Sequence, residues 1–134
     1  MDRVFLDANV LFSAAYRARS GLRKLWQLDG VTLLTSDYAM QEAHRNLDTA
    51  VQRRRLESLV AGVELVVCQT SDAPLPSGII LPDKDRPILA AAVHARATHL
   101  LTGDVTHFGK YFGTTAGGVT ILRPAEYLRG KLHE

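Results

Sequence analysis

The sequence predicts an α/β domain in which a mainly parallel sheet is covered by helices on both faces. Short apolar runs alternate with helical stretches along the chain, without internal repeats, and this alternation is typical of parallel strands connected by helices. The 134 residues suffice for one substantial core, and 46% hydrophobic with 22% charged residues is an ordinary globular composition. We therefore expect a single domain spanning residues 1–134.

The chain begins with a predicted strand and two predicted helices. Residues 3–7 form a short apolar run rich in β-forming residues, which favours a strand. Residues 9–16 then place apolar side chains at helical spacing. A second helix is expected over residues 22–28, where leucines and Trp26 form an apolar stripe, and Trp26 is interpreted as a core anchor.

The middle of the chain continues the alternation. Residues 31–36 read as a compact strand, and Ser36 or Asp37 can cap the helix behind it. Residues 51–62 predict a charged helix, and residues 63–68 predict a third strand.

The last part of the chain supplies two more strands and two more helices. Residues 85–97 are helical in composition, with Pro87 in the first turn, where its missing N–H costs least. Strands are expected at residues 99–104 and 119–122, the latter as the last strand, and Pro124 starts a terminal helix.

Cysteine content and hydropathy predict a cytoplasmic protein. Cys68 is the only cysteine, so no intramolecular disulfide can form, and its apolar neighbours suggest a buried, inert thiol. Neither a signal peptide nor an apolar run approaching the roughly 20 residues of a membrane span is evident.

Asp7 is the least expected residue of the first segment, because it separates two apolar runs at a strand-to-helix junction. A carboxylate buried there costs free energy unless it is paired, hydrogen-bonded or bound to a cation. In open parallel sheets, ligands bind beyond the carboxyl ends of the strands. Asp7 and Asp104 both follow strands. Asp85 begins a helix, and Glu42 lies within the first two turns of another. All four side chains can therefore reach the region beyond the carboxyl ends of the strands.

Each of the other acids also has an interpretation without function. Asp85 could favour the positive end of its helix by roughly 0.3–1 kcal/mol, Asp104 could be a turn residue after Gly103, and Glu42 could pair on the surface with His44 or Arg45.

Converging carboxylates repel one another unless a cation lies among them. A set rich in carboxylates and poor in His and Cys suits Mg²⁺ or Mn²⁺ better than Zn²⁺. Such sites favour metal-assisted hydrolysis of phosphodiester bonds.

Four segments of the chain resemble, in order and spacing, the successive motifs of PIN-domain proteins, particularly the VapC-like toxins of toxin–antitoxin pairs. These segments are VFLDANVLFSA, QEAHRNL, DKDRPILAAAVHARATHLLTGDVTHF and ILRPAEYL. The resemblance implies a three-layer α/β/α sandwich and an endoribonuclease whose catalytic acids bind Mg²⁺ or Mn²⁺. Those acids would be Asp7, Glu42, Asp85 and Asp104.

The resemblance also implies supporting residues. Asn9 matches a polar position that orients the first aspartate, Thr102 matches a small polar position before the last one, and His107 matches a frequent histidine that is either structural or a substrate contact. Ala8 departs from the Thr or Ser often found there. Asp83 is a rival to Asp85 for the third acid, but Asp85 is preferred because it stands directly before the helix, and Asp83 could be an accessory acid.

Partners are expected largely from the same resemblance: an RNA substrate, a cognate antitoxin protein and a second copy in a homodimer. A net charge of +2 favours an anionic partner only slightly. One basic stretch, which could face RNA, a partner or water, comprises Arg45, Arg53, Arg54 and Arg55. A second basic stretch comprises Arg17, Arg19, Arg23 and Lys24.

Two other functions stay open at this stage. An aspartyl phosphotransfer domain also places an Asp after an apolar strand, but it favours a second acid where this chain has Asn9. A non-catalytic binding module of the same fold is the other alternative, although it has no reason to retain so much like charge.

Overall fold

The computed structural model describes residues 1–67 and 73–132, and Cys68, with its expected buried thiol, lies outside them. Within these ranges six strands form one sheet in the order β3-β2-β1-β4-β6-β5, and the pairs are parallel except β5 with β6. The strands are β1 (Asp2–Leu6), β2 (Val31–Ser36), β3 (Glu64–Val66), β4 (His99–Leu101), β5 (Thr115–Ala116) and β6 (Val119–Leu122).

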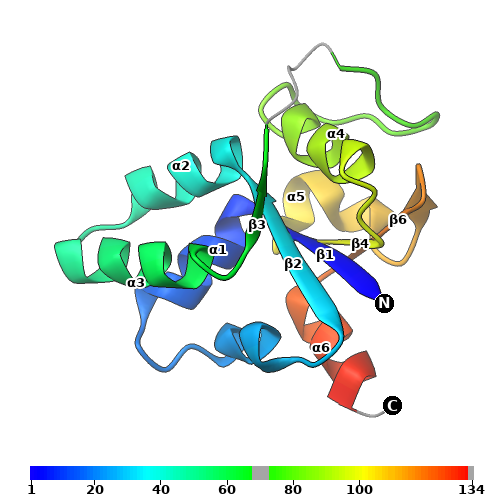
Figure 1. Ribbon diagram of the computed structural model, residues 1–134. Helices are drawn as coiled ribbons and strands as arrows, with labels where there is room; N and C mark the ends of the chain where they lie inside the picture. Colours follow the sequence, from blue (N-terminus) through cyan, green and yellow to red (C-terminus); the bar gives the residue numbers. More distant parts are fainter. Residues whose placement is uncertain (68–72, 133–134) are drawn as a thin grey trace.

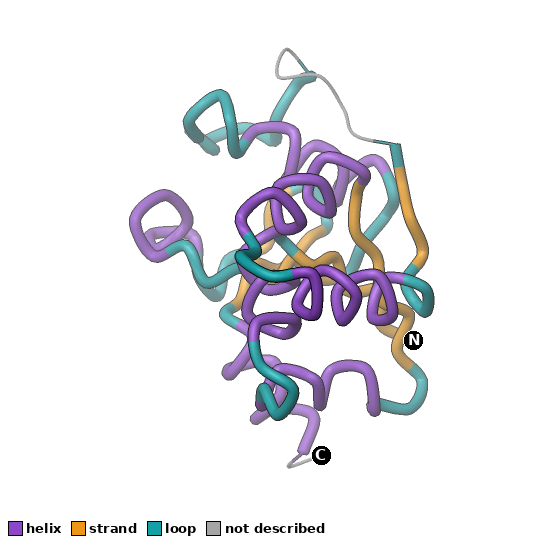
Figure 2. The backbone as a smooth tube through the Cα atoms, turned by 90° about the vertical axis from the view of Figure 1, so that its left-hand side faces the viewer, coloured by secondary structure: helices purple, strands orange, loops and turns teal. Residues whose placement is uncertain are grey.

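Helices cover both faces of this sheet, as the sequence predicts. Figure 1 shows α1, α2 and α3 on one side of the strands and α4 and α5 on the other, and in Figure 2 the first layer lies in front of the strands. The α-helices are α1 (Ala8–Tyr16), α2 (Asp37–Asn46), α3 (Ala50–Val60), α4 (Arg86–His94), α5 (Val105–Phe108) and α6 (Pro124–Leu132). The 3₁₀ helices are η1 (Gly21–Gln27) and η2 (Gly109–Tyr111).

The core lies on both faces of the central strands, which explains their continuous apolar sequence. Val4, Phe5 and Leu6 of β1 are all completely buried. Trp26 is partly buried against this core and donates its indole N–H to the carbonyl oxygen of Leu59 at 2.9 Å, so it anchors η1 to α3.

Several elements differ from the sequence-based expectation. The stretch expected as a helix over 22–28 is a 3₁₀ helix, and the strand expected over 63–68 has only three residues in the described part of the chain. The strand expected over 99–104 ends at Leu101, which leaves Thr102 to Asp104 as a loop.

Helix α5 and strand β5 were not anticipated. β5 pairs with β6 through a two-residue turn at Gly117 and Gly118, both with positive φ (58° and 82°), as hairpin turns of this length favour. No helix among residues 1–67 and 73–132 is long and apolar enough to cross a membrane.

The strand order places the position where ligands bind in open parallel sheets between β1 and β4. The chain leaves β1 toward β2 and β3 on one side and then returns to β4 on the other, so this is the topological switch point of the sheet. Leu6 pairs with Leu101, and the residues that follow these two strand ends meet at the same edge.

Candidate functional site

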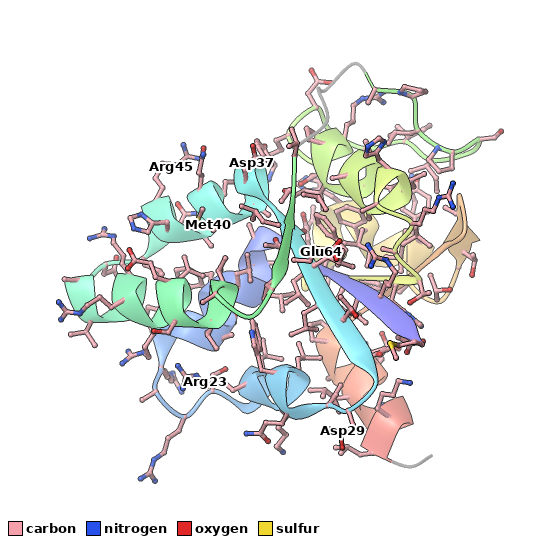
Figure 3. The ribbon with its side chains drawn as sticks, in the orientation of Figure 1. Arg23, Asp29, Asp37, Met40, Arg45 and Glu64 are labelled. Carbon is pink, nitrogen blue, oxygen red and sulfur yellow. The ribbon has the colours of Figure 1, made fainter. Side chains whose placement is uncertain are left out.

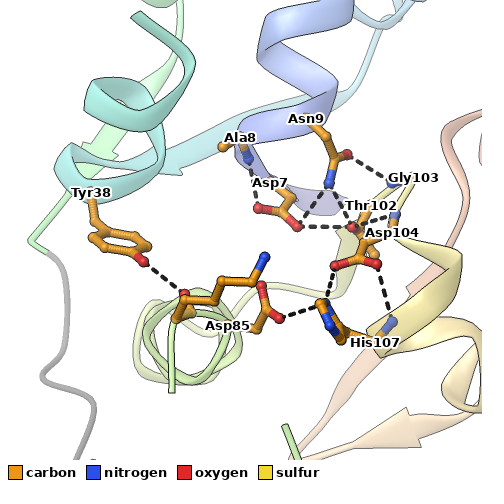
Figure 4. Close-up of polar contacts among 10 residues, drawn as sticks. Asp7, Ala8, Asn9, Tyr38, Asp85, Thr102, Gly103, Asp104 and His107 are labelled. Atoms are coloured by element: carbon orange, nitrogen blue, oxygen red, sulfur yellow. Dashed lines mark hydrogen bonds and ion pairs between the residues drawn. The ribbon is translucent and has the colours of Figure 1, made fainter. Parts of the chain in front are cut away.

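Asp7 follows β1 and is the N-cap of α1, and only 4% of its surface is exposed. Its Oδ1 accepts the backbone N–H of Ala8 at 2.6 Å. Its Oδ2 accepts the hydroxyl of Thr102 at 2.8 Å and the side-chain amide of Asn9 at 3.2 Å. The hydrogen-bond compensation that a buried carboxylate requires is therefore present, and it comes from two strand ends (Figure 4).

Thr102 and Asn9 join these strand ends into one network. The Thr102 hydroxyl is completely buried, and besides donating to Asp7 it accepts the Asn9 amide and the backbone N–H of Asp104, both at 3.1 Å. Asn9 Oδ1 accepts the backbone N–H of Gly103 at 2.8 Å. Both side chains thus hydrogen-bond to Asp7.

Asp104 is the N-cap of α5 and faces His107. Its Oδ1 accepts the backbone N–H of His107 at 3.1 Å, and its Oδ2 lies 2.8 Å from the ring Nδ1. The same Nδ1 lies 3.0 Å from Oδ2 of Asp85. The imidazole therefore sits between two carboxylates of the site (Figure 4).

Asp85 precedes α4 at the N-cap position but makes no capping hydrogen bond with its side chain. Its position at the N-cap still allows the favourable interaction with the helix macrodipole that the sequence left open, because that interaction needs no capping hydrogen bond. The residue is buried, and its Oδ2 has no hydrogen-bond partner among the described residues despite its short distance to His107. Asp83, the rival acid, is exposed on the preceding turn and does not line the pocket described next.

A pocket of about 270 Å³ opens between these residues and α2. Glu42 and Asn46 of α2 also line it, so all four predicted acids border one cavity. The lining residues are Asp7, Ala8, Asn9, Phe12, Glu42, Asn46, Lys84, Asp85 and Asp104.

The electrostatics of the pocket reflect this crowding. Burial, reinforced by the charges of Asp85 and Glu42, raises the pKa of Asp7 to about 6, although its hydrogen bonds from Thr102 and Ala8 oppose the shift. Burial also raises the pKa of Asp85, against the charges of Lys84 and His107. Two buried carboxylates in one cavity are thus costly to ionise.

Asp104 differs, because neighbouring donors stabilise its charged form. Burial opposes ionisation, but the backbone N–H and ring of His107, helped by the charge of Lys84, outweigh it and lower the pKa of Asp104. His107 therefore holds a negative charge on Asp104 at the pocket.

The residues present fit a hard divalent cation. Asp85, Asp104 and His107 offer ligand atoms within 4.8 Å of one another, and the pocket adds the carboxylates of Asp7 and Glu42. The buried Oδ2 of Asp85 accepts no hydrogen bond from the described residues, although it lies 3.0 Å from His107 Nδ1, and a cation in the pocket would bind this oxygen. Oxygen-rich donors of this kind suit Mg²⁺ and Mn²⁺.

The basic residues proposed as RNA contacts separate into two groups. Arg53 donates to the carbonyl oxygens of His44 and Leu47, and Arg55 donates to those of Ala15 and Tyr16. These two side chains hold helix ends together. Arg45 and Arg54 are exposed, and Arg45 projects outward from α2 (Figure 3).

Three pocket residues were missed by sequence reasoning: Phe12, Asn46 and Lys84. Lys84 lies between the two rival aspartates, so its closeness to the site was visible in the sequence. Phe12 and Asn46 line the pocket because of how α1 and α2 are rotated against each other, and no local pattern reports that rotation.

The fold and site define an α/β protein with an acidic pocket at its sheet switch point, and comparison with known proteins places it in a family. A model described as PIN domain matches residues 3–106. The chain therefore belongs to the PIN-domain family, as the sequence motifs suggested. A comparison with curated proteins found no match.

Solved structures support the same fold. VapBC2 from Rickettsia felis, bound to a DNA fragment from their promoter, matches with a TM-score of 0.65 and 13% identity, over 90% of this chain and 98% of that chain. FitAcB from Neisseria gonorrhoeae matches with a TM-score of 0.52 and 16% identity, over 91% and 98% of the two chains. At these identities the likeness concerns the fold.

Proposed function

We propose that this protein is a metal-dependent endoribonuclease that hydrolyses RNA phosphodiester bonds in the acidic pocket. The observation that carries the proposal is the buried Asp85 Oδ2, which accepts no hydrogen bond within the described part of the chain and lies 3.0 Å from His107 Nδ1, in a pocket that three further carboxylates border. A binding module without catalysis would gain nothing from ionising groups that burial makes so costly.

Asp7, Glu42, Asp85 and Asp104 would hold Mg²⁺ or Mn²⁺. A divalent cation there supplies charge stabilisation for a phosphate and lowers the pKa of water, the usual chemistry of such sites. Thr102 and Asn9 fix the orientation of the Asp7 carboxylate, and His107 does so for Asp104. Lys84, at the pocket wall, can pair with a phosphate oxygen.

The biological role proposed is that of a VapC-like toxin. The PIN-domain family match and the structural likeness to VapBC2 support it. On this proposal the protein is cytoplasmic, forms a homodimer and is held inactive by a cognate antitoxin.

The test is cleavage of a mixed-sequence RNA pool by the purified protein with Mn²⁺ or Mg²⁺, and with EDTA. Asp85→Asn should abolish cleavage, whereas Asp83→Asn, which removes the same charge from an exposed position two residues away, should keep most of it. Cleavage that persists in EDTA or in Asp85→Asn would refute the proposal. Mn²⁺ binding without cleavage of any RNA would instead favour a binding module.

A further inference from the structure

A second cavity lies beside α1 and shares one lining residue with the acidic pocket. Phe12 lines both, and the second cavity, of about 350 Å³, reaches the end of α1 and the segment after it. Its lining contains no acidic residue among those described: Phe12, Ser13, Tyr16, Arg17, Arg19, Ser20 and Gly21. A negative pocket thus adjoins a region that carries only positive charge.

Two aromatic rings line the second cavity, and one of them, Phe12, also lines the acidic pocket. Phe12 and Tyr16 lie one helical turn apart on α1, with ring centroids 5.3 Å apart and planes inclined by 33°. Phe12 is half-buried against the core, which fixes the pair, whereas Tyr16 is 39% exposed. Aromatic pairs at this spacing stabilise a helix only slightly, by about 0.2–0.5 kcal/mol. Helix stability therefore explains little of why the Tyr16 ring is exposed.

Arg17 and Arg19 supply the charge. Both are exposed, and neither makes a hydrogen bond or ion pair with any residue that the structure describes. Arg53, Arg55 and Arg23, by contrast, donate to main-chain carbonyl oxygens of neighbouring helices. The two arginines beside the aromatic rings are therefore available to a ligand.

We propose that Phe12, Tyr16, Arg17 and Arg19, here called the α1 track, bind the single-stranded RNA segment that flanks the phosphate held in the acidic pocket. Exposed rings offer stacking platforms for unpaired bases, and arginines bind the phosphates between them. Tyr16 lies nine residues along α1 from Asp7, about 13 Å at 1.5 Å per residue, so the stacked bases lie a few nucleotides from the cleaved bond. Duplex RNA has no free base faces to stack and is not expected to use the track. The inference rests on the proposed nuclease function for the position of the cleaved bond.

Binding can be tested separately from cleavage. Affinity for a fluorescently labelled, short, mixed-sequence single-stranded RNA is measured by anisotropy in EDTA, where no cleavage occurs. Tyr16→Ala and Tyr16→Leu should each weaken binding about tenfold, whereas Tyr16→Phe should stay within about twofold, because only the ring matters. Tyr16→Leu retains apolar packing and so excludes a folding defect as the cause.

The arginines give a second readout. Arg17→Ala combined with Arg19→Ala should weaken binding and reduce the slope of log affinity against log salt concentration by about 1.4, as expected for two phosphate contacts on a single strand. Arg96→Asn is the matched control: Arg96 is exposed after α4, on the other face of the sheet, and asparagine tolerates its positive φ of 58°. It should change neither quantity.

Equal binding by wild type, Tyr16→Leu and the double arginine variant would overturn the α1 track, even if the enzyme cleaves RNA. Loss of binding in Arg96→Asn to the same extent would also overturn it, because attraction would then be a property of the whole surface. Conversely, ring-dependent and arginine-dependent binding without metal-dependent cleavage would uphold the track and refute the nuclease proposal alone.

Discussion

The hydroxyl of Thr102 donates a 2.8 Å hydrogen bond to the buried carboxylate of Asp7, joining two residues that lie 95 positions apart in the sequence. The bond exists because β1 and β4 are parallel neighbours, with Leu6 paired to Leu101 just before these two residues. It brings together the two halves of the chain that form the acidic pocket.

Replacing Thr102 tests how far this bond orients Asp7. We expect Thr102→Val to lower the free energy of unfolding by about 1–3 kcal/mol and to weaken Mn²⁺ binding, because three polar groups lose a buried partner. Thr102→Ser should retain both properties. Calorimetric titration of Mn²⁺ and chemical unfolding measure the two effects.

Thr35→Val is the control for this substitution. Thr35 is equally buried and donates to the carbonyl oxygen of Leu6 at 2.8 Å, but it does not line the pocket. It should cost comparable stability while leaving Mn²⁺ affinity unchanged. Equal loss of Mn²⁺ affinity in both valine variants would mean that Thr102 acts through stability only.

The raised pKa of Asp7 makes the metal-free protein sensitive to pH. Because that pKa is about 6 in the folded protein and 3.8 for an ordinary aspartate, the folded state binds more protons between these values, so stability falls as pH rises through them. Asp7→Asn removes the effect. Relative to wild type, the variant should gain up to about 3 kcal/mol of unfolding free energy between pH 4 and pH 7, from roughly two pKa units.

Unfolding curves in EDTA across this pH range measure the difference. Saturating Mn²⁺ at pH 7 should raise the unfolding free energy of wild type more than that of Asp7→Asn, because the cation stabilises the ionised Asp7 carboxylate in wild type only. A difference between the two proteins that stays constant with pH would contradict an ionised, buried Asp7.

Arg55 and Arg54 offer a matched pair on α3. Arg55 donates to the last carbonyl oxygens of α1, at Ala15 and Tyr16, whereas Arg54 is exposed without a hydrogen bond to the described residues. Arg55→Ala should lower the free energy of unfolding by about 1 kcal/mol, and Arg54→Ala by less than about 0.5 kcal/mol. Thermal unfolding compares them. Equal effects would show that the carbonyl contacts of Arg55 contribute nothing.

Contacts at the other end of the strands, where β1 begins, should affect stability without affecting catalysis. Tyr127 of α6 donates to Asp2 at 2.7 Å, and Lys131 lies 3.0 Å from the same carboxylate oxygen. Burial opposes ionisation of Asp2, but these contacts outweigh it and lower its pKa. Tyr127→Phe should cost about 1 kcal/mol of unfolding free energy, less at acidic pH, where Asp2 becomes protonated.

Its RNA cleavage rate should match that of wild type, since Asp2 begins β1 and Asp7 follows its other end. A stability loss that is independent of pH would contradict a role of the Asp2 charge. A slower cleavage rate under conditions where the variant is folded would contradict the independence of the acidic pocket from these contacts.

The sequence predicted the parallel sheet and the closeness of the acidic residues beyond its strand ends, because both follow from general rules of α/β structure. Strands buried on both faces are continuously apolar, and residues after parallel strands meet at one edge. The prediction of the fold class, which is confirmed, used the continuously apolar strands. The predicted position of Asp7 used the rule that residues after parallel strands lie close together.

These rules could not predict the short elements or the contacts between side chains that are distant in the sequence. Helix α5 has four residues and β5 has two, too few to show a period. The carbonyl contacts of Arg53 and Arg55 depend on which helix ends lie nearby, so their sequence could not distinguish a structural arginine from one facing RNA. The same holds for Phe12, whose place on the pocket wall depends on the rotation of α1.

The most direct test of the acidic pocket as a metal centre is the anomalous scattering of Mn²⁺ in crystals of the protein soaked with that ion. We expect a peak bordered by Asp7, Asp85 and Asp104, with carboxylate oxygens as its ligands, including Oδ2 of Asp85. The peak should be absent from Asp85→Asn crystals and present in Asp83→Asn crystals. Manganese bound only elsewhere on the molecule, or an empty pocket at saturating Mn²⁺, would contradict the account.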